Sequence, residues 1–154
     1  MAKTFEECLI DARKVEAVIN RNLFVACAII TLVAMAMVVI EFFSRGNFFP
    51  SRIGFFYIGV LFVYSAHKEM LRWLGEKGTK RAGEFFLYSW IGLTLFFYII
   101  NFWTKDYYST SLEGKPLGCI SDVTLITLEV AAIFLLARIS KIIKIFTLRK
   151  KKKA

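Results

Sequence analysis

The sequence predicts an all-α integral membrane protein: a four-transmembrane-helix bundle with an N-terminal amphipathic helix and a basic amphipathic C-terminal end. Three observations lead to this prediction. Hydrophobic residues make up 57% of the 154 residues, and 16 residues are Phe. The apolar residues gather in blocks that approach membrane-spanning length, and the charged residues gather between these blocks. Lysine and arginine are unevenly shared between the segments on the two sides. Because lipid cannot hydrogen-bond the backbone, each apolar block is expected to fold as a helix.

Residues 1–22 are predicted to form a cytoplasmic N-terminal helix. Thr4 and Glu7 have the spacing of a capping box, and apolar residues then recur at helical intervals. This helix either extends the first span into the cytoplasm or lies on the membrane or a partner. Residues 23–43 are predicted to be the first span, since 23–40 contains no charge. Cys27, Thr31 and Ala34 line one face with small side chains that would allow close helix contact.

Residues 53–74 are predicted to be a second span with an interfacial extension. The uncharged part, 53–66, has only 14 residues. At about 1.5 Å per residue it is roughly 21 Å long, which is short of a hydrocarbon core of about 30 Å. It can still cross the membrane if Arg52 and Lys68 extend outward from its two ends. The alternative is a re-entrant or interfacial segment.

Residues 85–103 are predicted to be the third span, because all 19 are uncharged and aromatic residues mark both ends. The fourth span is predicted over 121–140, followed by a basic cytoplasmic tail over 141–154. In this tail basic residues alternate with Ile and Phe, which gives it a basic amphipathic character.

The distribution of basic residues predicts the orientation of the bundle. Residues 1–22, the segment 67–84 and the C-terminal end from Arg138 onward carry 17 Lys and Arg, and the two remaining loops carry four. Positive charge favours the cytoplasmic side, so both termini are predicted to be cytoplasmic. The membrane is then either a bacterial plasma membrane or, in a eukaryote, the endoplasmic reticulum.

Glu129 is the candidate functional residue, because it is an acid with long apolar sequence on both sides. A charge at the centre of the bilayer costs about 2.5–3.5 kcal/mol on insertion scales, so intramembrane acids are functional candidates. Asp122 lies seven residues earlier and therefore shares the same helix face within about 20°. Together they form a predicted intramembrane acidic site.

Three interpretations of Glu129 follow from the uncharged residues expected at its depth. It is protonated and hydrogen-bonded to a hydroxyl, it binds a proton or cation on a transport path, or it pairs with a basic residue of another subunit. No Lys or Arg is expected at mid-depth within this chain. The hydroxyl candidates are Tyr57, Tyr64, Thr94 and Tyr98.

Two further clusters carry weaker predictions. Glu41 is expected near Asp122 at the outer boundary, either in surface ion pairs with Arg45 or Arg52 or in a vestibule that attracts cations. His67 is the single histidine. It has no second ligand at metal spacing and no positioned catalytic partner, so we expect no enzymatic role, no metal and no cofactor.

The net charge of +9 is attributed to cytoplasmic flanks that face anionic lipid, and not to nucleic acid. The membrane-surface basic group is the run Lys150, Lys151, Lys152 and Lys153. The three cysteines are odd in number and widely spaced, so they predict no disulfide framework.

The resulting functional prediction is a small subunit or assembly partner of a membrane complex, which contacts homo- or hetero-oligomeric partners through its fourth helix. The absence of a large soluble domain and the unpaired acid both favour this interpretation. The alternative is a small oligomeric transporter or channel that uses Glu129 as its proton or cation site. The direction in which Glu129 points should distinguish them.

Overall fold

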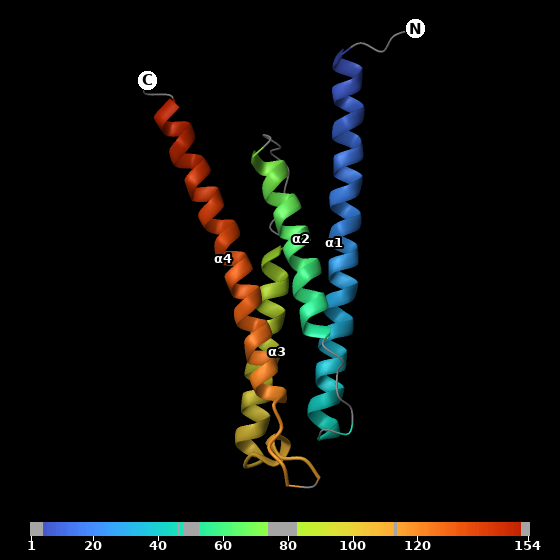
Figure 1. The fold of residues 1–154 in the computed structure, drawn as a ribbon, viewed down its shortest axis with the longest axis vertical. Coiled ribbons are helices and arrows are strands. Elements are labelled where there is room, and N and C mark those ends of the chain that lie inside the picture. The colour runs from blue at the N-terminus through green and yellow to red at the C-terminus, as the bar shows by residue number, and fades with distance from the viewer. Residues whose placement is uncertain (1–4, 46, 48–52, 74–82, 113, 152–154) are drawn as a thin grey trace.

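The computed structural model is all-helical (Figure 1). It describes residues 5–45, 47, 53–73, 83–112 and 114–151, and the side chains of 5–14, 17, 83 and 147–151 lie outside the description. Four α-helices follow one another along the chain, with one short 3₁₀ turn, η1 (Tyr107–Ser109), before the last. They are α1 (Phe5–Ser44), α2 (Ile53–Trp73), α3 (Gly83–Trp103) and α4 (Cys119–Lys151).

Among the described residues, three helices are long and apolar enough to cross a membrane. These stretches are Val18–Ser44 of α1, Glu84–Trp103 of α3 and Cys119–Phe146 of α4. Helices of this length and composition are typical of a protein embedded in a membrane. The predictions of an all-helical fold and of transmembrane helices are confirmed to that extent. The described α2 is not among the three, because its uncharged part ends after 14 residues at Ala66.

Two pairs of neighbouring predicted segments each form one continuous helix. The predicted N-terminal helix (1–22) and first span (23–43) form one continuous helix, α1, and α4 likewise continues from the fourth span into the basic tail. The predicted amphipathic face of 1–22 falls largely on side chains outside the described residues, as do Thr4 and the end of the second predicted segment, residue 74. Helical propagation explains the continuity, because no proline or glycine interrupts either sequence.

The helices run alternately up and down, so α1 begins and α4 finishes at the same end of the bundle (Figure 1). We call this the N/C end and the opposite one the loop end. α2 packs against both α1 and α4, and α3 packs chiefly against α4. At the N/C end α1 and α4 diverge and extend beyond α2 and α3 (Figure 1).

Aromatic side chains fill the core in layers along the bundle axis. Near the loop end, Phe42 of α1 stacks on Phe97 of α3, with ring centroids 4.2 Å apart. Closer to the N/C end, Phe24, Tyr64 and Phe86 bring α1, α2 and α3 together at centroid distances of 5.7–6.2 Å. These rings explain why three helices converge on one core in a protein so rich in Phe.

Arg45 closes the loop end. Its side chain donates hydrogen bonds to the carbonyl oxygens of Thr110 and Ser111, at 3.0 and 3.1 Å, and stacks 4.0 Å from the centroid of the Tyr107 ring. Arg45 itself has a positive φ of 54°, so the chain turns sharply immediately after α1. The connection between α3 and α4 is thereby fixed to the end of α1.

Candidate functional site: an acidic groove between three helices

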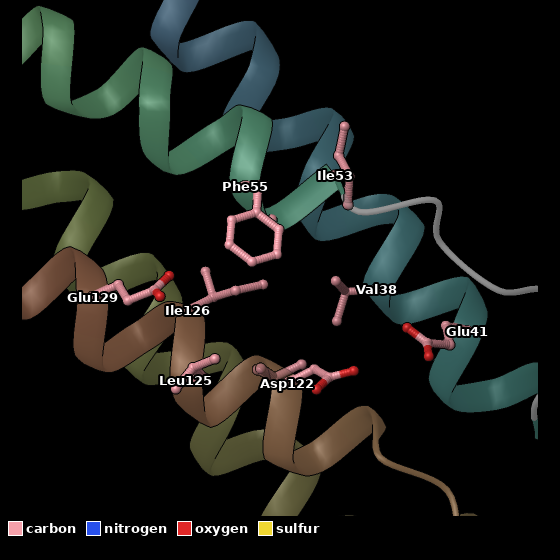
Figure 2. Close-up of a pocket in the computed structure, with 10 residues that line it drawn as sticks. Val38, Glu41, Ile53, Phe55, Asp122, Leu125, Ile126 and Glu129 are labelled. Atoms are coloured by element: carbon pink, nitrogen blue, oxygen red, sulfur yellow. The ribbon is translucent and has the colours of Figure 1, made fainter.

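A groove of about 240 Å³ lies near the loop end, where α1, α2 and α4 meet (Figure 2). Its polar side chains are three carboxylates: Glu41 from α1, and Asp122 and Glu129 from α4. The rest of its lining is apolar and includes Val38, Phe55 and Ile126 among others. We call this feature the acidic groove.

The groove exists because α2 begins very close to α4. Gly54, in the first turn of α2, has no side chain, and a Cβ added there would lie 3.2 Å from Cδ1 of Ile126. This close approach lets the backbone of α2 reach the face of α4 that carries Asp122 and Glu129. Val38 and Val123 are buried and form part of the apolar lining.

Glu41 and Asp122 form the end of the groove nearest to the loops. Their carboxyl groups are close enough to interact electrostatically. The neighbouring Cys119 thiol is directed to the Val38 carbonyl oxygen, 4.0 Å away. Glu41 is partly exposed and Asp122 is exposed. Figure 2 shows the Asp122 carboxylate turned toward Glu41. The structure therefore places these two acids near each other at one boundary of the bundle, as the sequence predicts.

Neither predicted arginine is shown as a partner of Glu41. Arg45 is directed to the loop and binds Thr110 and Ser111 instead, and Arg52 lies outside the described residues. None of the described residues that line the acidic groove is basic. The groove thus carries three acidic side chains on an otherwise apolar lining.

Glu129 lies deeper along α4 and faces the groove. It is partly exposed, and Figure 2 shows its carboxylate on the side of the Phe55 ring. Within the described part of the chain no hydrogen bond or ion pair involves Glu129. Glu129 therefore points toward a cavity that opens at the bundle surface.

The hydroxyl groups expected around Glu129 have other neighbours. The Tyr57 hydroxyl accepts a hydrogen bond from the indole nitrogen of Trp90 at 2.8 Å, and Tyr64 packs on Phe24 and Phe86. Both tyrosines are buried in the core. No contact between either tyrosine and Glu129 is found among the described residues, so the predicted hydrogen bond stays a prediction.

Thr94 and Tyr98, on α3, are directed to threonines on α4. The hydroxyl oxygens of Thr94 and Thr127 are 2.7 Å apart, and those of Tyr98 and Thr124 are 3.1 Å apart. These contacts form a polar seam between α3 and α4 on the opposite side of α4 from Glu129. Polar pairs of this kind stabilise helix association within lipid.

The N/C end carries a second set of polar contacts. Arg138 of α4 pairs with Glu84 of α3, Lys144 donates to the backbone carbonyl of Arg72, and Trp73 donates to the Ser140 hydroxyl at 2.9 Å. Lys150 and Lys151 lie in the last turn of α4, and their side chains and all of Lys152 and Lys153 lie outside the described residues. The predicted lipid-binding role of this lysine run remains a prediction.

Sequence reasoning did not identify the apolar walls of the groove. Ile53, Gly54 and Phe55 come from the start of α2, and only the packing of α2 against α4 brings them beside Glu129. The one available signal is Gly54, since glycine in the first turn of a helix is compatible with a close helix contact. No three or more His, Cys, Asp or Glu side chains among the described residues are grouped to hold a metal ion.

Comparison with known proteins adds no assignment to this site. No protein-family model, no curated protein and no solved structure matches the chain. The function must therefore be argued from the groove, the polar seam and the two ends of the bundle.

Proposed function

We propose that the chain is a four-span subunit or assembly partner of a membrane complex, and that it contacts its partner through α4 and the acidic groove. The observation that carries this proposal is the position of Glu129. It lines an open groove with two other acids, and no described residue pairs with it. The proposal assigns no catalytic step to the chain.

The physical argument concerns the cost of isolated charge in lipid. A carboxylate in this setting is stabilised either by taking up a proton or by a nearby cation. A Lys or Arg from a neighbouring transmembrane helix would supply the cation, and the apolar walls would pack against the rest of that helix. Such intramembrane acid–base pairs mark specific contacts, because either charge alone in lipid is unfavourable.

The proposal counts α2 as a fourth span despite its short apolar part. Tyr57, Leu61 and Tyr64 of α2 are buried in the same core as residues of α1, α3 and α4. Removing α2 from the bilayer would expose that core, whereas leaving it there costs only local adjustment of Lys68 and its neighbours. The up-and-down course of the helices, with the ends of α1 and α4 together, is compatible with both termini on the cytoplasmic side (Figure 1).

Site-specific photo-crosslinking in native membranes tests the assembly proposal. A photoreactive residue replaces Phe55, whose side chain is exposed at the groove. We expect one dominant adduct with a membrane protein whose transmembrane segment carries Lys or Arg. Glu129→Gln should reduce the yield of this adduct about tenfold or more, which corresponds to roughly 1.4 kcal/mol.

As a matched control, the glutamine side chain is introduced at the neighbouring exposed residue, Leu128, in place of Glu129. Leu128 is 62% exposed on α4 and does not line the groove. Leu128→Gln should leave the adduct unchanged. A monomeric particle in mild detergent, together with a crosslinking pattern that is identical in wild type and Glu129→Gln, contradicts the proposal.

A second candidate function is a small oligomeric transporter or channel in which Glu129 is the proton or cation site. The observation that favours it is the same cavity, which gives Glu129 access to the surface of the bundle. Reconstitution of the full chain into liposomes measures proton and monovalent cation flux directly. This candidate predicts flux that is lost in Glu129→Gln, and flux that survives the substitution excludes Glu129 as the coupling site.

We also propose that the basic C-terminal end binds anionic lipid and holds the orientation of the chain. Each basic residue near a negatively charged membrane surface contributes about 1 kcal/mol. Replacing Lys150–Lys153 by Gln should therefore reduce the preference of the reconstituted protein for its cytoplasmic-termini orientation. Protease accessibility of the C-terminus in sealed vesicles measures that preference, and an unaltered preference contradicts the role.

A further inference from the structure

A buried polar contact joins α1 and α2 at the N/C end, away from the acidic groove. The Nε2 atom of His67 lies 3.9 Å from the Oε2 atom of Glu16. Both atoms are buried, and neither has a hydrogen-bond partner within the described part of the chain. Asn20 lies one turn further along α1, and its Oδ1 atom is also buried without a partner.

The structure places the Glu16 carboxylate opposite Nε2 of His67. A carboxylate oxygen can only accept hydrogen bonds. A neutral imidazole has one N–H, whereas an imidazolium has an N–H on both nitrogens. A proton taken up by His67 therefore guarantees a donor at Nε2, directed toward the Glu16 carboxylate.

Several charged side chains at this end have other neighbours. Glu69 forms an ion pair with Arg72, and Glu84 forms one with Arg138. Lys144 donates a hydrogen bond to the carbonyl oxygen of Arg72, and the Lys68 ammonium lies over the ring of Tyr64. Among described residues, Glu16 is the acid of α1 that faces His67. The contact thus links one histidine with one carboxylate across two helices.

We propose that His67 and Glu16 form a proton-operated latch that fixes the cytoplasmic-side arm of α1 against α2. Beyond Glu16, α1 runs on to Phe5, and at this end the helices spread apart (Figure 1). Protonated His67 holds the arm through a charge-assisted hydrogen bond to Glu16. Neutral His67 holds it less strongly, because a hydrogen bond from a neutral imidazole to Glu16 is no longer charge-assisted.

The direction of the pH dependence follows from which form binds. The charge-assisted contact needs the protonated imidazole, so it is strongest at mildly acidic pH and weakens as pH rises. Histidine is the side chain that changes charge in the range of about pH 5 to 8. At much lower pH carboxylates in general become neutral, and the attraction is lost again.

Distance measurements between spin labels on the full chain in lipid nanodiscs test the latch. Labels replace Val15 on α1 and Met70 on α2, which are 58% and 53% exposed. Cys8 is replaced by Ser, and Cys27 and Cys119 are buried. We expect one narrow distance distribution at pH 5.5 and a distribution about twofold wider at pH 8.

Two variants and one control distinguish the latch from a general effect of pH. His67→Gln and Glu16→Gln should each give the wide distribution at both pH values. Glu84→Gln, which breaks a different ion pair at the same end, should leave the wild-type response intact. The latch is refuted by a wild-type distribution that is unchanged between pH 5.5 and 8, or by a pH response that survives in both His67→Gln and Glu16→Gln.

Discussion

Trp90 donates its indole N–H to the hydroxyl of Tyr57 across 2.8 Å, and both side chains are completely buried between α2 and α3. This hydrogen bond connects two helices in the middle of an apolar core. Buried polar groups are stable where they have a hydrogen-bond partner, and the Trp90 N–H has one in the Tyr57 hydroxyl.

Tyr57→Phe should destabilise the bundle by about 1–2 kcal/mol. The substitution keeps the ring but leaves the Trp90 N–H buried without an acceptor. Unfolding titrations in mixed micelles give the free energy of unfolding. Tyr64→Phe is the matched control, because Tyr64 is also buried but its hydroxyl makes no hydrogen bond within the described residues. Equal losses in both variants would show that the hydrogen bond is unimportant.

Substitution of Gly54 should separate α2 from α4. A Leu side chain there meets Ile126 immediately, because even a Cβ lies 3.2–3.3 Å from two of its atoms. We expect Gly54→Leu to cost about 1–3 kcal/mol through overpacking. Gly59 is also in α2, but a Cβ there meets nothing within 4 Å. Gly59→Leu should consequently be neutral or slightly stabilising in the same unfolding titration.

Arg45→Ala should loosen the connection between α3 and α4. The guanidinium binds two backbone carbonyls and stacks on Tyr107, so its loss leaves the loop without its link to α1. Loss of about 1.4 kcal/mol of local stability corresponds to tenfold faster amide exchange across 107–117. Hydrogen exchange with mass spectrometry measures this rate. Lys105→Ala removes a charge from the same loop and should leave the rate unchanged.

Exchanging the charges of Glu84 and Arg138 should largely preserve stability. The two side chains form an ion pair between α3 and α4, and both are partly exposed. Either reversal alone places like charges together, so we expect each single variant to cost about 0.5–1 kcal/mol and the double variant to recover most of it. Additive losses in this double-mutant cycle would mean that the pair does not stabilise the N/C end.

The helical architecture could be predicted from the sequence because lipid leaves the backbone few alternatives. The small-residue stripe Cys27, Thr31 and Ala34 was also readable, and all three residues are buried. The sequence left open whether the N-terminal helix extends the first span, and α1 is one continuous helix from Phe5 to Ser44. A change in polarity at residue 22 or 140 changes the surroundings of a helix without ending it. Composition marks where a helix leaves lipid, whereas only helix-breaking residues mark where it stops.

The candidate site was predicted only in part. The shared face of Asp122 and Glu129 and the proximity of Glu41 to Asp122 follow from helix periodicity and depth. The partners of the hydroxyl groups do not follow, because depth along the bundle does not specify which way α3 is rotated. The structure turns Thr94 and Tyr98 toward Thr127 and Thr124, and so leaves Glu129 on the groove side of α4.

The seam between α3 and α4 contains two hydroxyl pairs that have the same number of protons but different numbers of contacts. Tyr98 and Thr124 make two contacts, one between their hydroxyls and one from Thr124 to the Ile120 carbonyl, and have two protons for them. Thr94 and Thr127 make three contacts, one between them and one from each to the carbonyl four residues earlier, again with two protons. One of the three must lack a hydrogen at any moment, so two hydrogen-bond arrangements that keep the contact between the hydroxyls are compatible with the same helix positions. Thr94→Val removes one proton and two contacts together, and the hydroxyl of Thr127 then remains bonded to the Val123 carbonyl in a single arrangement.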